Sequence, residues 1–265
     1  LDTSRIEPFD PKRVTFGRHE TFHLRFGWLT KGFQALKEQT DVFERDDATV
    51  TLGVGKNMVH AIRYWMIASG VVTANGRSLE PTAIGEAIFA ENGLDPYLED
   101  DTTIWLIHWL LASNPSDATA IYWFFNYFHK PEFTPVEANS ALKDFVRERI
   151  QSKVSVATLK HEIAVVLRMY VPSIGNKSVP LEEALDSPLS MLGLVARLET
   201  GKRYQSKQEV RWTLPLGVLG FAVAELFEKS NQTNLPVETV FRGDGWLSGP
   251  GSIFRLTQDC LVTKL

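Results

Sequence analysis

The sequence has very little cysteine and no hydrophobic segment long enough for a membrane. Its 265 residues include a single cysteine, Cys260, which excludes an intrachain disulfide framework and fits a reducing compartment. No charged segment followed by an apolar run opens the chain, and no apolar stretch is long enough to span a bilayer. We therefore expect a soluble, cytoplasmic protein without a membrane partner.

The sequence also lacks an excess of positive charge. Its formal net charge is −4 and its pI is about 5.9, so no overall basic field predicts nucleic-acid binding. Any such role must depend on a local basic patch. With 44% hydrophobic residues, the chain is long enough to bury a sizeable core in two or three compact units.

Recognisable signatures of nucleotide hydrolysis and of common nucleases are missing too. The segment GVGKN resembles a phosphate loop, but Val50 stands where that loop needs its first glycine, and Asn57 stands where it needs the hydroxyl that holds magnesium. We therefore exclude an NTPase. The P-D…E-x-K pattern of restriction-type nucleases, the H-N-H arrangement and the G-I-Y signature are not found in recognisable form.

The first third of the chain has the periodicity of several helices. Four apolar residues at helical spacing predict the first of them: Phe26, Leu29, Phe33 and Leu36. The next segment predicts a short helix, a turn and a long helix. The apolar face of the long helix is expected to consist of Val59, Ile62, Trp65 and Met66.

Two short strands joined by Asn75-Gly76 are expected to follow. This dipeptide favours a type I′ hairpin turn, because both central residues of that turn must accept positive φ. Another short helix closes the unit. The order helix, helix-turn-helix, hairpin predicts a winged helix-turn-helix over about 24–92, within a first domain of residues 1–92 that begins with a polar lead-in.

Residues 93–176 predict a helical second domain. The segments IWLIHWLL and IYWFFNYF are apolar almost all round, which favours buried core helices over a platform for stacking bases. Thr134 is expected to be the N-cap of a further helix, with Pro135 at its first position. A last amphipathic helix is expected to end at Pro172.

Residues 177–265 are more broken and predict a small C-terminal α+β portion, with a second winged-helix-like piece. The chain ends at QDCLVTKL without an evident stop signal, which indicates a C-terminus that is cut short. The fold class predicted for the whole chain is mainly α (α+β). It comprises an N-terminal winged helix-turn-helix, a helical domain and this C-terminal portion.

The segment HETFH, residues 19–23, fits the H-E-x-x-H pattern of zinc peptidases. On a helix, this spacing places two imidazoles on one face, beside a carboxylate that acts as general base. The third ligand is missing, because Phe26 and Leu29 stand where the extended pattern needs glycine and histidine. We therefore expect no zinc. The structural alternative is that His19 and Glu20 join a polar network that orders the N-terminal segment.

The long helix of the first domain also has a polar face directed away from its predicted core. Gly53 and Gly55 permit a tight turn before this helix, as in winged-helix regulators. The side chains expected to reach DNA grooves and phosphates are Lys56, Asn57, His60, Arg63 and Tyr64, with Arg77 of the hairpin as a wing contact. A winged helix that contacts protein is the alternative.

The segment LDPYLEDD gathers several carboxylates, which are Asp95, Glu99, Asp100 and Asp101. A loop that caps the following helix is the favoured interpretation. A set of metal-binding carboxylates is the alternative, which would need convergent partners from elsewhere in the chain.

Five blocks of sequence resemble one bacterial family, in the same order along nearly the whole chain. They are FGRHETFHLRFGWLTKGF, LGVGKNMVHAIRYW, LDPYLEDDTTIWLIHWLL, YWFFNYF and PGSIFRL. The family was formerly a domain of unknown function, and it includes the SspB component of Ssp-type DNA phosphorothioation systems. The resemblance implies a role in bacterial anti-phage defence. In these systems a cysteine desulfurase, an ATP pyrophosphatase and an ATPase place sulfur on the DNA backbone, and the SspB component is associated with DNA nicking.

The resemblance also selects a polar cluster near the start of the chain. The family block centres on Phe-Gly-Arg-His-Glu-Thr-Phe, residues 16–22 here, and does not depend on the second histidine. It suggests a DNA nicking endonuclease in which Arg18 and Arg25 hold the scissile phosphate. In that hypothesis His19 acts as base or acid, and Glu20 binds a divalent metal, Mg²⁺ or Mn²⁺.

Double-stranded DNA is the expected ligand, and the other phosphorothioation proteins are the expected partners. The alternative to a nickase that prepares the backbone for sulfur is a non-catalytic DNA-reading or adaptor subunit. Its winged helix would position the modification enzymes. The polar cluster would then bind phosphate or brace the N-terminal segment.

Overall fold

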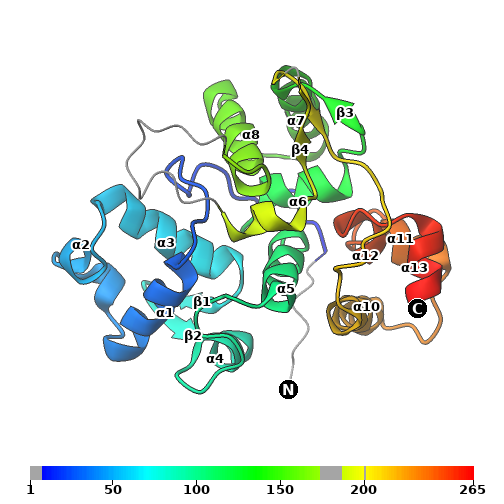
Figure 1. Ribbon diagram of the computed structural model, residues 1–265. Coiled ribbons are helices and arrows are strands. Elements are labelled where there is room, and N and C mark those ends of the chain that lie inside the picture. Colours follow the sequence, from blue (N-terminus) through cyan, green and yellow to red (C-terminus); the bar gives the residue numbers. More distant parts are fainter. Residues whose placement is uncertain (1–7, 174–186, 200) are drawn as a thin grey trace.

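The computed structural model describes residues 8–173, 187–199 and 201–265 (Figure 1). It is mainly helical with two small sheets, which confirms the α+β class. A continuous hydrophobic core extends from Phe9 to Leu261 and joins segments from the whole described chain. None of the helices in these ranges is long and apolar enough to cross a membrane. The division into three domains at 92 and 176 stays a prediction.

The N-terminal unit consists of short helices followed by a two-stranded hairpin. Its elements are α1 (Trp28–Glu38), η1 (Val42–Glu44), α2 (Ala48–Thr51), α3 (Lys56–Ala68), β1 (Val72–Asn75), β2 (Ser78–Pro81) and α4 (Ala83–Phe89). The predicted apolar face of α3 is buried, since Val59, Ile62, Trp65 and Met66 are each at most 4% exposed. The predicted helix, turn, helix, hairpin order of this segment is confirmed.

The hairpin turn differs from the predicted type. Asn75 pairs with Ser78 as the last residue of β1, so the two central residues of the turn are Gly76 and Arg77. Gly76 has a φ of 63°, whereas Arg77 is not among the residues with positive φ. A glycine at the first central position is typical of a type II′ turn. The prediction of type I′ was wrong because it placed Asn75 inside the turn.

Four helices form the centre of the molecule: α5 (Asp101–Ala112), α6 (Thr119–Asn126), α7 (Pro135–Arg149) and α8 (Val156–Tyr170). Nearly every residue of α5 and α6 is buried, as their apolar sequences predict. Helix α8 packs against both α6 and α7. The predicted N-cap of α7 is confirmed, because Thr134 and Glu137 form a complete capping box.

The C-terminal segment contributes η2 (Pro188–Leu192), β4 (Ala196–Arg197), β5 (Tyr204–Gln205), α10 (Leu216–Ser230), α11 (Val237–Arg242), α12 (Pro250–Ile253) and α13 (Gln258–Lys264). Its two strands pair with β3 (Glu132–Phe133) in the order β3-β5-β4. They therefore extend a sheet that starts before residue 176, where the prediction had a separate winged-helix-like piece. Residues 1–7 of the predicted lead-in and 177–186 of the predicted C-terminal portion lie outside the described residues.

His108 of α5 is a fully buried titratable group at the centre of this core. Its Nε2–H donates to the carbonyl of Ile253 at 3.0 Å, and its Nδ1 accepts the hydroxyl of Tyr170 at 2.8 Å. The ring is therefore neutral, with its proton on Nε2. Burial is the main cause that lowers the pKa of His108 to about 3.

This lowered pKa predicts sensitivity to acid. The unfolded chain binds a proton at this histidine near pH 6.5, whereas the folded chain binds it only near pH 3. The free energy of unfolding should thus fall by about 1.4 kcal/mol per pH unit as the pH drops through this range. In urea denaturation between pH 7 and 5, His108→Gln should show a shallower pH dependence than the parent. Equal slopes would mean that His108 does not make this contribution.

Candidate nucleic-acid interface

Residues 16–25, here called the anchor segment, form a turn followed by irregular chain and not a helix. Glu20 and Thr21 have φ values of 49° and 66°, in the left-handed region that non-glycine residues rarely adopt. The helical geometry that would place His19 and His23 on one face is therefore not formed. Backbone strain of this kind is concentrated at functional sites, which directs attention to what this turn positions.

His19 is buried where the anchor segment meets α3 and α8. Its side chain is almost inaccessible, and its Nε2 lies 3.0 Å from Oε2 of Glu162 on α8. Its Nδ1 accepts the backbone N–H of Thr21 at 3.1 Å. The indole of Trp65 on α3 stacks on the imidazole, with ring centroids 6.0 Å apart. His19 thus contacts both helices and its own turn.

The protonation of His19 follows from these contacts. Because Nδ1 accepts an N–H, the ring proton lies on Nε2 and faces Glu162. The separation of 3.0 Å meets the distance of an ion pair but lacks the angle of a linear hydrogen bond, so the attraction is mainly electrostatic. Both ring nitrogens are directed at partners inside the protein. These contacts favour a positioning role for His19 over a role as catalytic base.

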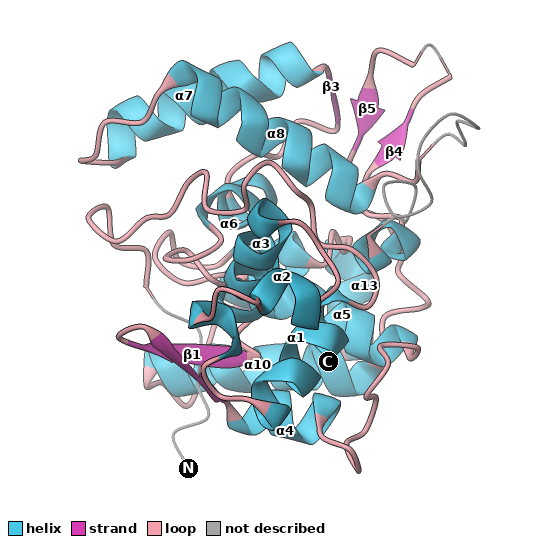
Figure 2. Cartoon of the chain, turned by 90° about the vertical axis from the view of Figure 1, so that its left-hand side faces the viewer, coloured by secondary structure: helices cyan, strands magenta, loops and turns pink. Residues whose placement is uncertain are grey.

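Two further hydrogen bonds hold the anchor segment between the helices. The backbone N–H of Gly17 donates to Oε1 of Glu162 at 2.5 Å, so this buried carboxylate contacts two points of the segment. The indole N–H of Trp65 donates to the carbonyl of Phe22 at 3.1 Å. The segment therefore links α3 to α8, and Figure 2 shows these two helices with loop segments between them.

The four residues of the hypothetical nickase cluster do not share one environment. Arg18 and Glu20 are exposed, whereas His19 and Arg25 are buried. The guanidinium of Arg25 lies over the ring of Phe22, 5.5 Å from its centroid. Arg25 lines the cavity described next, and the other three residues do not.

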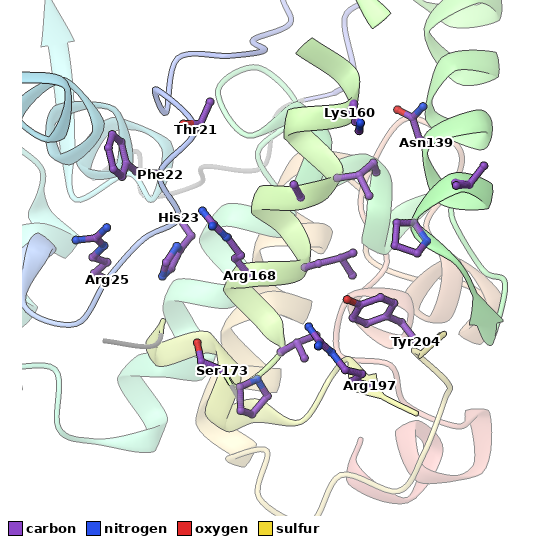
Figure 3. Close-up of a pocket in the computed structure, with 17 residues that line it drawn as sticks. Thr21, Phe22, His23, Arg25, Asn139, Lys160, Arg168, Ser173, Arg197 and Tyr204 are labelled. Carbon is purple, nitrogen blue, oxygen red and sulfur yellow. The ribbon is translucent and has the colours of Figure 1, made fainter. Parts of the chain in front are cut away.

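The anchor segment forms one wall of a cavity of about 890 Å³ (Figure 3). Helices α7 and α8 and the strands β4 and β5 supply the other walls. The wall residues are partly apolar, as with Phe22 and Leu167. The polar and charged residues that line the cavity are Thr21, His23, Arg25, Asn139, Lys160, Arg168, Ser173, Arg197 and Tyr204.

Four basic side chains from separate parts of the chain line this cavity: Arg25, Lys160, Arg168 and Arg197. Lys160 and Arg168 are exposed and lie about two turns apart on α8. The guanidinium of Arg197 lies over the ring of Tyr204, 5.5 Å from its centroid. The described residues of the lining include no carboxylate. The cavity therefore attracts anions, and DNA phosphate is one anion that it suits.

The predicted DNA-contacting side chains of α3 lie on the outside of the N-terminal unit. Lys56, Asn57 and His60 are exposed. The Nη2 of Arg63 donates to the backbone carbonyl of Arg77 at 3.2 Å, which joins α3 to the hairpin turn. The structure thus brings the basic residues of α3 and of the predicted wing together.

Tyr64 differs from the other residues expected on this face. Its hydroxyl donates to the backbone carbonyl of Asp117 at 2.8 Å, and its ring contacts His19 edge-on. Burial raises the pKa of the phenol well above its usual value of 10, so the hydroxyl stays a protonated donor. The side chain is half-buried beside the anchor segment, which corrects the expectation that it faces outward.

The sequence interpretation missed Lys160, Arg168 and Arg197. A signal existed for the first two, because residues 160, 164 and 168 recur at four-residue spacing and so share one helical face. All three of these positions are exposed on a helix that is otherwise largely buried. Arg197 gave no such signal, because only the tertiary fold brings β4 next to α8.

The acidic run before α5 caps the helix, as the favoured interpretation predicted. The carboxylate of Asp95 accepts the backbone N–H groups of Glu99 and Asp100 at 2.8 and 3.0 Å. Asp100 accepts the N–H of Thr102 at 2.7 Å and is the N-cap of α5. Within the described ranges, no group of three or more His, Cys, Asp or Glu side chains is arranged to hold a metal ion.

Comparison with known proteins identifies the family. The chain belongs to the family described as "Protein of unknown function (DUF4007)", whose model matches residues 16–265. A search of the curated proteins finds no match. The match covers the anchor segment, α3, the described residues that line the cavity and the C-terminal helices.

Two solved structures are similar to this chain over nearly its full length. The magnesium ion-bound crystal structure of SspB is 29% identical, with a TM-score of 0.82 over 95% of this chain and 76% of that one. A second SspB crystal structure is 27% identical, with a TM-score of 0.82 over 98% of this chain and 78% of the other. The resemblance to SspB expected from the sequence blocks is confirmed.

The buried contact of His19 predicts a structural penalty for its removal. Because Glu162 would lose one of the two groups that contact its buried carboxylate, and Trp65 its stacking partner, His19→Ala should lower the free energy of unfolding by about 1–3 kcal/mol. Glu20→Gln changes the exposed neighbouring residue and is the matched control, with an expected change below about 0.5 kcal/mol. Urea denaturation measures both. If the two variants were equally stable, His19 would not anchor the segment.

Proposed function

We propose that this protein is a DNA-binding component of a bacterial DNA phosphorothioation system that acts in anti-phage defence. The observation that carries the proposal is the pair of basic surfaces, the outer face of α3 and the cavity beside α8, which the anchor segment links. The similarity to SspB, the component of Ssp-type systems, supports the biological context. The ATPase, the ATP pyrophosphatase and the cysteine desulfurase of such a system are the proposed partners.

The N-terminal unit is assigned as a winged helix-turn-helix in which α3 contacts DNA. The order of α2, a tight turn, α3 and the β1–β2 hairpin supports this assignment. Gly53 in the turn has a φ of 60°, a conformation that glycine adopts without strain. In this motif the second helix enters the major groove and the wing contacts the backbone. Lys56, Asn57, His60 and Arg63 are then the residues that reach the groove and its phosphates, and Arg77 is the wing contact.

The cavity is assigned to the sugar–phosphate backbone of the same DNA. Its basic residues come from the anchor segment, α8 and β4, so they form a concave positive surface and not a single row. Phosphate contacts of this kind fix the register of a protein on DNA and make binding depend on salt. Arg25 and Arg168 are central to this role, and exposed Arg18 extends it along the turn.

Nicking of the bound strand would rely on Glu20 as the ligand of Mg²⁺ or Mn²⁺. This exposed carboxylate directly precedes Thr21, which lines the cavity. Magnesium is often held by one or two carboxylates together with substrate phosphates. A single glutamate therefore fits the ion only when a DNA phosphate is the second ligand. The bound ion would supply charge stabilisation at the phosphodiester. The magnesium ion-bound state of SspB supports a divalent metal.

A non-catalytic DNA-reading or adaptor subunit is the second candidate function. The contacts of His19 favour it, because the residue expected to act as base is buried against Glu162 and Trp65. In this case the anchor segment serves to hold α3 and the cavity in one fixed arrangement, and the partner enzymes carry out the chemistry.

Supercoiled plasmid incubated with the purified protein and Mg²⁺ or Mn²⁺ tests the nickase. We expect conversion to open circle, and a loss of rate of about 100-fold or more in Glu20→Gln, because a bound ion contributes several kcal/mol of charge stabilisation. Gel retention of DNA by this variant should persist. Lys229→Gln, which changes an exposed charge on α10, is the control and should nick like the parent.

The outcomes separate the two functions. DNA retention without conversion in either metal would reject the nickase and support the reading subunit. Nicking by Glu20→Gln at the parental rate would remove Glu20 from the site. If the parent protein neither retained DNA in the gel nor converted the plasmid, DNA binding itself would be contradicted.

A further inference from the structure

A second polar cavity, of about 290 Å³, lies between the end of α6, the chain after β5, and α12. It contains residues of the PGSIFRL block, which the DNA-binding account does not use. No carboxylate is among the described residues that line it. The lining residues that matter here are His129, Ser206, Lys207, Arg242, Ser252 and Arg255.

Arg255 lines this cavity and is a buried residue, 2% exposed. Its Nε donates to the hydroxyl of Ser206 at 3.1 Å. Its two Nη groups donate to backbone carbonyls at and just beyond the C-terminal end of α6, those of Phe124, Phe125 and Phe128, at 2.8 to 3.3 Å. These partners orient the guanidinium, but all of them are neutral.

The charge of Arg255 is therefore not balanced by an acid within the described residues. The ion pairs found there do not include this residue. Burial, and after it the nearby charge of Arg211, lower the pKa of Arg255 to about 9, which still leaves it protonated at neutral pH. A buried cation is normally paired. The cavity above it is thus positioned to receive an anion.

One donor faces the same cavity without a protein acceptor. The hydroxyl of Ser252 is 1% exposed and has no hydrogen-bond partner in the described structure. Buried hydroxyls are normally bonded, and this one lines a cavity next to an unpaired cation, so a ligand there can accept its hydrogen bond. His129 lines the same cavity, but its ring is bonded to the backbone of Asn126.

The cations at the rim of the cavity have carboxylate partners. Arg242 lies 2.7 Å from Glu238, and Lys207 lies 3.0 Å from Glu209. Glu209 also pairs with Arg211 at 3.3 Å, so its single charge is shared by two cations. The rim therefore adds positive charge to that of the buried Arg255.

We propose that this cavity binds a phosphate group, which accepts a hydrogen bond from Ser252 and balances the charge of Arg255. Its volume corresponds to about ten water molecules at about 30 Å³ each, which is enough for a phosphate and part of an attached group. The phosphate is either free in solution or the terminal phosphate of a nucleic-acid strand. This site does not depend on the proposed function of the larger cavity.

Thermal unfolding in sodium phosphate, against sodium chloride at equal ionic strength, tests the site. Phosphate should raise the midpoint of the parent, because a ligand of the folded state stabilises it. Ser252→Ala should weaken the apparent affinity for phosphate about tenfold or more, since it removes a bond to a charged ligand. Ser248→Ala is the matched control, because that hydroxyl is also buried and unbonded but lies outside the cavity lining.

Further measurements show which cavity binds phosphate and where that phosphate comes from. The double variant Lys160→Ala, Arg168→Ala should keep the phosphate response, and the side-chain nitrogen shift of His129 should move on phosphate addition. If a 5′-phosphorylated oligonucleotide competes with phosphate for the site, and its 5′-hydroxyl form does not, the ligand is the end of a strand. If neither oligonucleotide competes, the ligand is free phosphate. The proposal is overturned if phosphate acts no better than chloride. It is also overturned if Ser252→Ala responds like the parent, or if the response is lost in the Lys160, Arg168 variant.

Discussion

The contact between His19 and Glu162 fixes the arrangement on which both proposed DNA surfaces depend. Glu162 contacts the anchor segment at His19 and at Gly17, and Trp65 of α3 contacts it from the other side. Because these groups are buried, separating them would cost the attraction between a carboxylate and an imidazole that are both shielded from water. α3 and the basic residues of α8 are consequently held at one relative position.

Although the net charge of the chain is −4, positive side chains are concentrated at two cavities. On α8, Lys160 and Arg168 are exposed cations that line an open cavity, and no carboxylate is among the described residues of its lining. At Arg255 a single buried cation is held by neutral carbonyls. The first arrangement suits a long polyanion through several weak contacts, whereas the second suits one phosphate group through a desolvated charge. The two sites therefore differ in what they recognise.

Much of the local structure could be predicted, because periodicity and capping act within a few residues. The burial of Trp65 and Met66, and the capping box of Thr134, are examples. Features that depend on tertiary contacts could not be predicted from the sequence. The register of the hairpin moved Asn75 out of the turn, and Tyr64 turned inward to reach Asp117. The site was predictable only in part: the anchor segment stood out, but its His19 is held by Glu162, which lies far away in sequence.

The salt dependence of DNA binding tests most directly whether α3 and α8 contact the same duplex. We expect Lys56→Ala with Arg63→Ala, and separately Lys160→Ala with Arg168→Ala, each to reduce the slope of log K against log salt by about 2, one unit per lost phosphate contact. The charge-matched pair Lys229→Ala with Arg147→Ala should leave the slope unchanged. If the α8 pair also left it unchanged, the cavity would lie outside the DNA path and the account would be wrong.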